Sequence, residues 1–396
     1  MNHPALTIRD LTDPGQGPHA IQLIVDALRT ALAESWPAAE VRVRRDHPVV
    51  PLADNYDNLG YAPDAVTRDA RYTRYVGPGE VLRSHSSAMV PPALRQLAAE
   101  SSAESSAESG DESGDESGDE SGDDEAAPGD VLLVCAGICY RRDSVDWQHT
   151  GTPHQLDLWR IKRTAPCAEA DLERMIAGVV EAALPGADWR TVPAVHPYTT
   201  EGRQIDVRWQ GQWIEIGECG LASAGVLRRA GLDATWAGLA MGLGLDRLVM
   251  LRKGIGDIRL LRSADPRVAA QLTDLAPYRP VSAMPAVRRD LSVVIGPEVD
   301  ASDEALGDRV REALGEQADA VESVEARGET TYDALPETAR ARLQLEPGQR
   351  NLLVRLVLRP LDRTLTDAEA NELRDRVYAE LHEGRVAEWA APEPAS

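Results

Sequence analysis

The sequence predicts an α+β fold in two parts, and three features of the chain indicate it. Several short stretches alternate apolar with polar residues, as strands do, and longer stretches repeat every three or four residues, as helices do. After residue 278 the predicted elements follow the order strand, helix, strand, strand, helix. The two parts fit a length of 396 residues, which is enough for two or three domains.

The first part mixes helices with strands along the chain. Helices are predicted at 19–35, near 92–99, at 168–184 and from 245 to 252, and strands at 131–140, at 154–161, at 204–216 (a hairpin turning near Gly211) and at 238–244. Residues 131–140 are almost all apolar, which indicates a strand that is buried on both faces.

The second part is shorter and more regular. We predict strands at 287–295, 320–330 and 351–359, and helices at 303–314 and 367–383. This βαββα order suggests a ferredoxin-like domain. Pro266 and Pro277 mark the boundary, so we predict one domain over 1–275 and a second over 278–391.

The acidic charge of the chain is concentrated in one place. The net charge is −23, and residues 101–124 consist of six tetrads: SSAE twice, SGDE three times and SGDD once. We interpret 100–127 as a disordered, solvated insert because such a stretch cannot bury enough apolar surface to fold. An acidic tail that binds a partner is the alternative. Residues 279–396 carry 15 basic and 24 acidic residues, which argues mildly against a nucleic-acid partner.

The location of the protein is predicted from what its sequence lacks. No apolar run approaches the ~20 residues of a membrane span, and the N-terminal residues do not resemble a secretory signal. The four cysteines have neither metal-finger nor disulfide-framework spacing. We therefore expect reduced thiols in a cytoplasmic protein with no membrane partner.

The stretch from Gly238 to Arg247 points to chemistry. Gly238, Gly242 and Gly244 alternate with apolar residues in a predicted strand, and glycines in a strand let a flat group approach the backbone. Arg247 follows at the start of the next helix, where its fork of donors suits a phosphate. The alternative is a tightly packed strand with an arginine that faces solvent.

Three stretches taken together resemble one enzyme family. Residues 139–155, which include Arg141, His149 and Gln155, resemble motif 2 of the class II aminoacyl-tRNA synthetases, and residues 242–248 resemble motif 3. Residues 82–87 (LRSHSS) resemble a segment particular to phenylalanyl-tRNA synthetase, and residues 278–292 resemble the start of that family's anticodon-binding domain. The combination is similar to the single-chain, organellar form.

The resemblance implies both a fold and an activity. The fold is an antiparallel sheet flanked by helices, followed by the ferredoxin-fold domain. The activity is ATP- and Mg²⁺-dependent joining of phenylalanine, or a related amino acid, to tRNA through an aminoacyl-adenylate. The resemblance implies no need for a separate β subunit and is compatible with a monomer.

The resemblance also assigns roles to individual residues. Arg141, His149 and Arg247 are the catalytic candidates. The implied ATP-binding residues are Arg141, Asp143, His149, Glu215, Gly242, Gly244 and Arg247, and Glu215 is also the candidate metal ligand. The implied amino-acid-binding residues are His85, Ser87, Gln155, Asp157, His196, Tyr198 and Ala240.

Plainer interpretations of these residues stay open. Arg141 could be a surface residue of a hairpin, and His149 an ordinary polar loop residue. Glu215 could simply pair with an arginine in a half-buried strand. His85 could be a core histidine whose hydrogen bonds are satisfied.

Several positions depart from the family's pattern. His196 and Tyr198 stand where the family has two phenylalanines that sandwich the substrate ring, and Glu218 stands where it has glycine. Asp157 and Asp246 replace glutamates. Two alternatives therefore accompany the ligase hypothesis: a paralogue that activates another amino acid or uses an acceptor other than tRNA, and an inactive module that binds tRNA or an amino acid.

Overall fold

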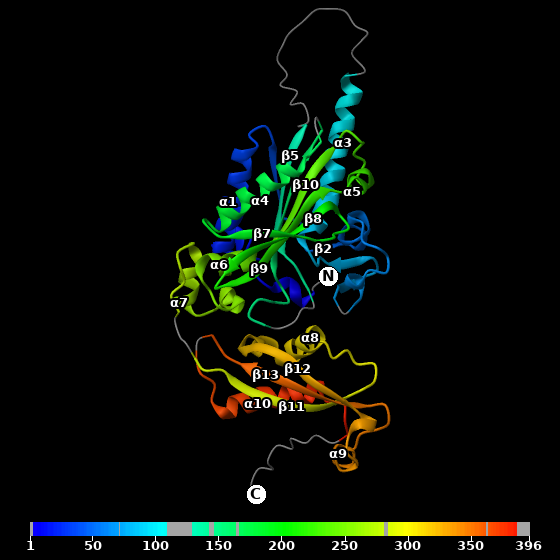
Figure 1. Cartoon of the computed structure of the whole chain (residues 1–396), viewed down its shortest axis with the longest axis vertical. Helices are drawn as coiled ribbons and strands as arrows, with labels where there is room; N and C mark the ends of the chain where they lie inside the picture. The colour runs from blue at the N-terminus through cyan, green and yellow to red at the C-terminus, as the bar shows by residue number, and fades with distance from the viewer. Residues whose placement is uncertain are drawn as a thin grey trace, which may run out of the picture. The chain divides into compact units, whose positions relative to one another are not determined.

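The computed structural model describes residues 3–70, 72–108, 129–141, 146–163, 166–280, 284–361 and 363–385. The chain divides into two compact units (Figure 1). Unit 1 consists of Met1–Tyr140, Thr152–Lys253 and Thr273–Leu275, and unit 2 of Arg141–Gly151, Gly254–Leu272 and Ala276–Ser396. The predicted α+β class is confirmed.

Unit 1 is built on a seven-stranded sheet. Its strands, in spatial order, are β1 (Glu40–Arg44), β5 (Asp130–Ile138), β6 (His154–Lys162), β10 (Ala237–Gly244), β9 (Gln212–Ala222), β8 (Thr199–Trp209) and β7 (Trp189–Pro193). Only β1 and β5 run parallel, so the antiparallel sheet that was expected is a mixed sheet with one parallel pair at its edge. A smaller sheet has the order β2 (Val49–Pro51), β4 (Glu80–Leu82), β3 (Arg74–Gly77).

Helices cover both faces of the large sheet (Figure 1). The helices of unit 1 are α1 (Ala20–Ser35), α2 (Leu52–Asn55), α3 (Val90–Glu108), α4 (Glu169–Ala183), α5 (Ala224–Arg229) and α6 (Leu245–Lys253). Helices α1, α4 and α6 lie together on one face. The buried side of α3 packs with α5 on the other face, against residues that include Leu133, Trp159 and Ala240. This second face carries the candidate site.

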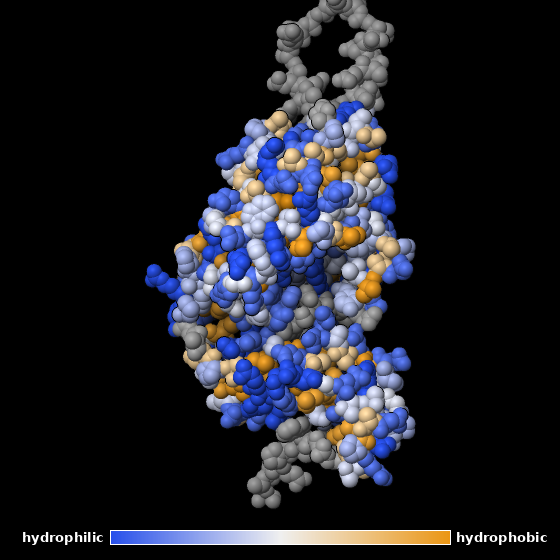
Figure 2. Space-filling model, viewed as in Figure 1, coloured by the Kyte–Doolittle hydropathy of each residue, from blue (hydrophilic) through white to orange (hydrophobic). Residues whose placement is uncertain are grey.

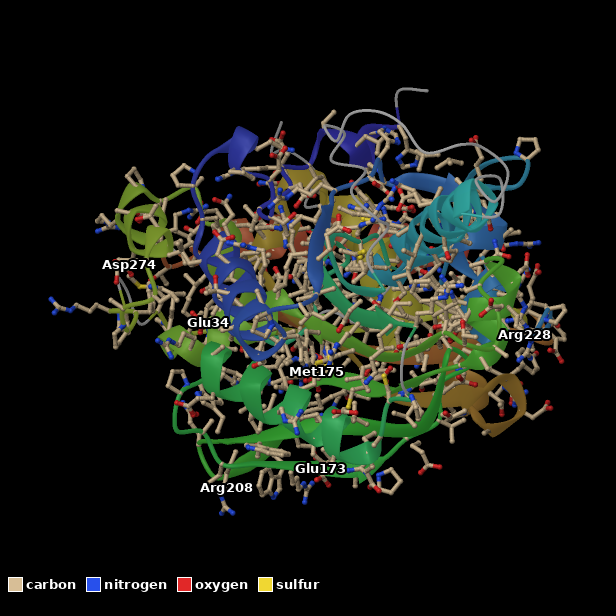
Figure 3. All side chains as sticks on the ribbon, turned by 90° about the horizontal axis from the view of Figure 1, so that it is seen from above. Glu34, Glu173, Met175, Arg208, Arg228 and Asp274 are labelled. Carbon is tan, nitrogen blue, oxygen red and sulfur yellow. The ribbon has the colours of Figure 1, made fainter. Side chains whose placement is uncertain are left out.

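Helix α4 shows how the sequence specifies these layers. Its buried residues recur at the three- and four-residue spacing of an amphipathic helix: Leu172, Met175, Ile176, Val179, Val180 and Ala183. Met175 is fully buried, whereas Glu173, two residues earlier, is exposed (Figure 3). The predicted helix over 168–184 is confirmed.

The hairpin between β8 and β9 turns where the sequence predicted. Gln210 and Gly211 form a two-residue turn, with φ angles of 48° and 84°. Two residues with positive φ match the right-handed twist of the flanking strands. Both strands extend beyond the predicted 204–216.

The prediction for the start of the acidic insert was wrong. Helix α3 continues to Glu108, so residues 101–108 are helical rather than a loop. Alanine and glutamate are good helix formers, and extending a helix whose first turns are already packed costs little. The remainder of the predicted insert, 109–127, lies outside the described residues.

Unit 2 contains the predicted βαββα order. Its elements are α7 (Pro266–Ala269), β11 (Val287–Ile295), α8 (Asp303–Leu314), β12 (Val321–Thr331), α9 (Glu337–Leu343), β13 (Arg350–Leu358) and α10 (Asp367–Leu381). The antiparallel sheet has the order β11-β13-β12, and α8 and α10 share its apolar core. The short helices α7 and α9 were not predicted.

The outer surface is mostly polar on the face seen in Figure 2, with apolar residues in small separate groups. In the part of the chain that the structure describes, no helix is both long and apolar enough to cross a membrane.

Candidate active site

Asp157 of β6 is a buried carboxylate at the centre of the candidate site. Its side chain accepts hydrogen bonds from Ser86 Oγ at 2.5 Å and from Trp159 Nε1 at 3.2 Å. Ser87 is a third donor. Burial raises the pKa of Asp157 above its ordinary 3.8, and the three hydrogen bonds oppose this shift in part. A carboxylate offers about four acceptor positions, so one remains for a ligand cation.

Three other predicted amino-acid-binding residues lie in the same unit. The ring of His85 stacks on Tyr61, with centroids 5.7 Å apart. Gln155 lies two residues before Asp157 on the same face of β6, and its buried Oε1 has no hydrogen-bond partner among the described residues. Ala240 is fully buried and pairs with Trp159 in the sheet register.

His196 and Tyr198 form a second polar cluster with Glu218 of β9. His196 Nε2 lies 3.0 Å from Glu218 Oε2, and Tyr198 Oη donates to the same oxygen at 3.5 Å. Because a carboxylate only accepts hydrogen bonds, Nε2 carries the imidazole hydrogen. The Nδ1 atom is then left to accept from Thr199 Oγ1 at 3.4 Å. Three of the departures seen in the sequence, at His196, Tyr198 and Glu218, are therefore in direct contact.

The implied sandwich around a substrate ring is not present in this structure. The rings of His196 and Tyr198 stack on each other, with centroids 5.7 Å apart and an interplanar angle of 23°. Stacked aromatic rings lie roughly 4.5–7 Å apart from centroid to centroid, so this spacing is that of a direct pair with no third ring between them. A substrate ring could instead contact the outer side of the pair.

The glycines of β10 do not share one role. A Cβ atom on Gly242 would have nothing closer than the Asp157 carboxylate oxygens, at 3.9 Å, and one on Gly244 only Arg247 Cβ, at 3.8 Å. These two positions leave open space on the site face, as predicted. A Cβ on Gly238 would lie 2.6 Å from Ile161 Cδ1, so this glycine instead allows close packing within the sheet.

The register places the two carboxylates on either side of this open space. Asp157, Gly242 and Glu218 are paired in one row across β6, β10 and β9. Directly paired residues project from the same face, so both side chains flank the bare backbone of Gly242. Adjacent strands lie about 4.8 Å apart, which puts the two carboxylate-bearing Cα atoms about 10 Å apart.

Arg247 and Glu215 meet at the other end of the motif. Arg247 Nη1 donates to the backbone carbonyl of Glu215 at 2.8 Å, which anchors the guanidinium beside β9. The buried Nε of Arg247 has no partner among the described residues. Glu215 pairs with Asp206, and Glu218 with Gln204, so the two glutamates share the site face despite the intervening register shift.

A structural triad near Arg247 was not predicted. His154 accepts a hydrogen bond at Nε2 from the backbone N–H of Leu11 (3.0 Å) and therefore donates through Nδ1 to Asp246 (3.0 Å). The backbone N–H of His154 also donates to Asp246. These bonds tie the first turn of α6, and hence Arg247, to the end of β6. The short distance from Asp246 to Arg247 along the chain was the only signal in the sequence.

The motif 2 candidates lie on a loop that belongs to unit 2. Arg141 N donates to Gly151 O at 2.9 Å, which closes the loop at its base. His149 Nδ1 lies 2.7 Å from Asp146 Oδ2. Burial alone would raise the pKa of Asp146, but the bonds from His149 and the loop backbone outweigh it and lower that pKa. Asp143 lies outside the described residues.

Sequence reasoning thus missed several residues that the structure brings to the site. Ser86 and Trp159 bind Asp157, and Asp146 orients His149. Ser86 adjoins the predicted Ser87, so the pair of neighbouring hydroxyls was the available signal. Arg141 and His149 belong to one unit, and the other described site candidates to the other.

A Mg²⁺ ion would have few protein ligands here. Among the described residues no group of three or more His, Cys, Asp or Glu side chains is arranged to hold a metal. Mg²⁺ in enzymes of phosphate chemistry is commonly held by one or two carboxylates together with the substrate's phosphates. Glu215, on the site face beside Arg247, fits that pattern.

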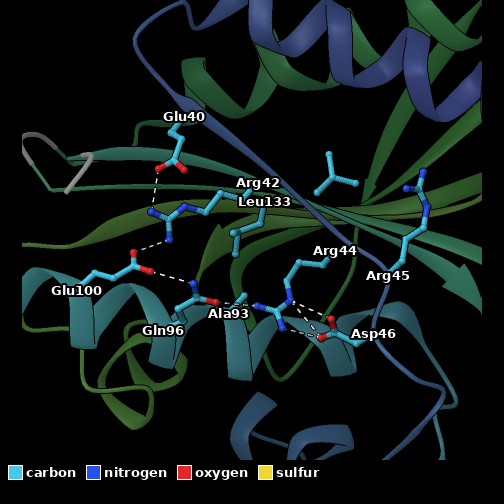
Figure 4. A pocket seen from close by; sticks show the side chains of 10 residues that line it. Glu40, Arg42, Arg44, Arg45, Asp46, Ala93, Gln96, Glu100 and Leu133 are labelled. Atoms are coloured by element: carbon cyan, nitrogen blue, oxygen red, sulfur yellow. Dashed lines mark hydrogen bonds and ion pairs between the residues drawn. The ribbon is translucent and has the colours of Figure 1, made fainter. Parts of the chain in front are cut away.

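A separate groove of about 440 Å³ lies between β1 and α3 (Figure 4). Arg42 is bound to Glu40 at 2.8 Å and to Glu100 at 2.7 Å, and Arg44 to Asp46 at 2.9 Å. The groove shares no lining residue with the site described above. Apart from Arg45, its charged lining residues pair with one another, so we assign it no ligand.

The fold and the residues on the open face of the sheet define a class II aminoacyl-tRNA synthetase core. The family profile described as "tRNA synthetases class II core domain (F)" matches residues 124–272. The chain is 30% identical to the phenylalanine–tRNA ligase alpha subunit of Prochlorococcus marinus (strain MIT 9313), over 62% of this chain and 71% of that protein. The chain belongs to the phenylalanine–tRNA ligase family.

Two organellar relatives are similar over more of the chain. The chloroplastic/mitochondrial phenylalanine–tRNA ligase of Arabidopsis thaliana is 26% identical, over 84% of this chain and 69% of its own length. The mitochondrial phenylalanine–tRNA ligase of Saccharomyces cerevisiae is also 26% identical, over 84% of this chain and 80% of its own length. The predicted similarity to the single-chain organellar form is confirmed.

Proposed function

We propose that this protein activates an amino acid with ATP to form an aminoacyl-adenylate and then transfers the acyl group to tRNA. One observation carries the proposal: Asp157, buried and fixed by three donors, keeps an acceptor position beside the open backbone of Gly242 and Gly244. That arrangement suits an ammonium group held next to a flat ligand. Family membership supports the same reaction.

Activation forms a bond between the carboxylate of the amino acid and the α-phosphorus of ATP, and pyrophosphate leaves. Catalysis of such a step is mainly positioning and neutralisation of anionic charge. In the proposal Asp157 and Gln155 hold the ammonium group, with His85 and Ser87 beside them. Arg141 and His149 hold the α-phosphate region, and Arg247 the distal phosphates.

The remaining ATP-site assignments follow from the same face of the sheet. Gly242 and Gly244 leave space for the nucleotide, and the carboxylate of Glu215 holds Mg²⁺ or ATP. When bound, Mg²⁺ would supply further neutralisation of the phosphates. Asp143 keeps its proposed place in the ATP site by resemblance alone.

The wider role follows the organellar relatives. We propose a catalytic domain over 1–275 and an anticodon-binding domain over 278–391, acting as a monomer on phenylalanine or a related amino acid and on tRNA. The four cysteines are free, and burial raises the pKa of Cys219 to about 12, so this thiol is unreactive. Unpaired cysteines are consistent with a reducing compartment, and we propose the cytoplasm.

A second candidate function is favoured by the contact between His196 and Glu218. A paralogue that activates another amino acid, or passes the acyl group to a different acceptor, would need an altered amino-acid site. An inactive binding module is the third candidate. An inactive module would have no need for an arginine prepared to bind phosphate. Arg247 is anchored through the Glu215 carbonyl, and its Nε atom has no partner among the described residues.

Amino-acid-dependent exchange between ATP and pyrophosphate tests the proposal. The full chain should catalyse exchange with at least one amino acid, and Arg247→Ala should lower the rate by about 10²–10³-fold. Glu169→Ala is a matched control because Glu169 is exposed and pairs with Arg203 at the start of α4. If no amino acid supported exchange, the activation proposal would be wrong.

A further inference from the structure

Glu218 is held in a fixed position by its neighbours rather than free on the surface. His196 and Tyr198 both bind its Oε2 atom, and both of these rings are buried, with 8% and 6% exposure. The two rings stack on each other, and Tyr198 also packs 6.0 Å from Trp159. The packed aromatic cluster therefore fixes the orientation of the Glu218 carboxylate.

The second oxygen of Glu218 is available to a ligand. No described residue donates a hydrogen bond to Oε1, and the side chain is 41% exposed. A carboxylate fixed through one oxygen and open at the other accepts well from a hydroxyl or N–H. Contact with a hydrocarbon ring would be unfavourable for this carboxylate, because the ring would displace bound water and provide no hydrogen bond in its place.

The position of Glu218 relates it to the amino-acid end of the site. Glu218 and Asp157 flank Gly242 in one row of the sheet, with the Asp157 carboxylate 3.9 Å from where a Cβ atom on Gly242 would be. The charge of Glu218 contributes to the raised pKa of Asp157. Asp157 and Glu218 therefore border one space, and no cationic side chain among the described residues is bonded to both carboxylates.

We infer that Glu218 selects an aromatic amino acid whose ring carries a hydrogen-bond donor, such as a phenol hydroxyl or a ring N–H, in preference to phenylalanine. This inference rests on the proposed function, because Asp157 must hold the ammonium group of the same substrate. The ring lies against the His196–Tyr198 pair, and its donor binds Glu218 Oε1. His196 and Tyr198 are positioning residues for Glu218.

An aromatic side chain is favoured over an aliphatic cation by what surrounds the carboxylate. Three aromatic rings, those of Trp159, Tyr198 and His196, form a continuous series beside it. Ala240, opposite Trp159, is small and buried. Trp159 is fully buried and the Tyr198 and His196 rings are 6% and 8% exposed, so a substrate would contact only the outer margin of this series. Ring-on-ring contact there favours an aromatic side chain over an aliphatic one.

The test compares kcat/KM in ATP–pyrophosphate exchange for phenylalanine, tyrosine, meta-tyrosine, histidine, para-aminophenylalanine and lysine. Sites built to hydrogen-bond a substrate hydroxyl reject the analogue without it by as much as about 10⁴–10⁵-fold. We expect one of the donor-bearing aromatic substrates to exceed phenylalanine by at least about 100-fold in the wild-type protein. In Glu218→Ala that preference should fall below about tenfold, mainly through lost activity with the donor-bearing substrate.

Two further variants keep the test decisive. Glu218→Gln retains an acceptor oxygen and should keep part of the preference, and Glu169→Ala should keep all of it. Preference for phenylalanine or lysine in the wild-type protein would overturn the inference and leave activation standing. An unchanged preference in Glu218→Ala would also overturn it. Exchange with no amino acid would contradict the proposed function and this inference together.

Discussion

Asp157 and Glu218 are two carboxylates on one face of one sheet, separated by a single glycine position. They differ in burial and in the hydrogen bonds that they accept. Asp157 is 2% exposed and receives three hydrogen bonds, whereas the Glu218 side chain is 41% exposed and receives its contacts on one oxygen. Burial makes the charge of Asp157 costly until a cation arrives. Exposure leaves the Glu218 carboxylate in contact with water when no ligand is bound.

The difference suggests a division of labour between the two groups. A buried carboxylate that is fixed by three donors and keeps one acceptor position suits the ammonium group that every amino acid carries. A half-exposed carboxylate with one open oxygen suits the part of the substrate that varies. Activation and selectivity would then depend on different residues of the same sheet, and the predictions below separate them.

The largest effect is expected from Arg247→Ala. Loss of a preorganised donor to developing negative charge typically lowers kcat by about 10²–10³-fold. The variant should fold normally, because it loses only one hydrogen bond, to the Glu215 carbonyl. Exchange kinetics and thermal unfolding measure the two quantities, and Arg247→Lys would show how much depends on charge alone. Activity within about twofold of wild type in the Ala variant would remove Arg247 from the proposed site.

Asp157→Asn should lower activity and raise stability at the same time. Removing a charged partner of the ammonium group should reduce kcat/KM by about 10²-fold, since hydrogen bonds to charged groups contribute roughly 1.5–3 kcal/mol. The folded-state pKa of Asp157 is raised, so the wild-type protein binds this proton more tightly when folded. Its unfolding free energy therefore falls as the pH rises from the ordinary value of 3.8 through the raised pKa.

The Asn variant has no such group and should not show that fall. Urea unfolding without ligand, at several pH values from about 4 to 8, should show the stability difference between variant and wild type growing with pH. A constant difference across this range would mean that Asp157 is not destabilised by its burial.

Substitutions of two histidines should distinguish a residue that is needed for stability from one that is needed for activity. His154 is fully buried between Leu11 and Asp246, so His154→Ala would remove a side-chain partner from the buried Asp246 carboxylate and the acceptor of the Leu11 N–H. We expect a cost of about 3–5 kcal/mol of unfolding free energy. His149 has a side chain that is 37% exposed and binds Asp146. His149→Ala should change stability by less than about 1 kcal/mol but lower the exchange rate. Equal losses of stability would show that the motif 2 loop is primarily structural.

The smallest effect is expected from the acidic repeats. Deletion of residues 109–124, which removes only repeat residues beyond the end of α3, should change exchange activity by less than about twofold, because no candidate site residue lies in this stretch of the sequence. Exchange kinetics of the deletion variant test this. A larger loss would show that the repeats have a functional role.

The sequence predicted most of the fold because local patterns determine most of it. Strand β11 and helix α8 were predicted with their observed bounds, since their apolar spacing is unambiguous. Helix α3 was predicted too short, because high charge hid the helical tendency of alanine and glutamate after residue 100. The parallel pairing of β1 with β5 depends on long-range contacts that no local pattern records.

Many residues of the site could be predicted from the sequence, but the contacts that these residues make could not. The amino-acid candidates Asp157, His196 and Tyr198 were identified. The bond from His196 to Glu218, however, joins a residue of the loop between β7 and β8 to a residue of β9 that is 22 positions away. The triad through His154 spans 92 positions to Asp246. Such pairings depend on strand register, which follows from packing of the whole sheet and not from local sequence.

The most direct test of the account is the ratio of kcat/KM for the best donor-bearing aromatic amino acid to that for phenylalanine, measured in Asp157→Asn and in Glu218→Ala. Asp157→Asn should lower both values by the same factor and leave the ratio unchanged. Glu218→Ala should reduce the ratio by at least about tenfold. A ratio that moves with Asp157 and not with Glu218 would contradict the division of labour proposed for the two carboxylates.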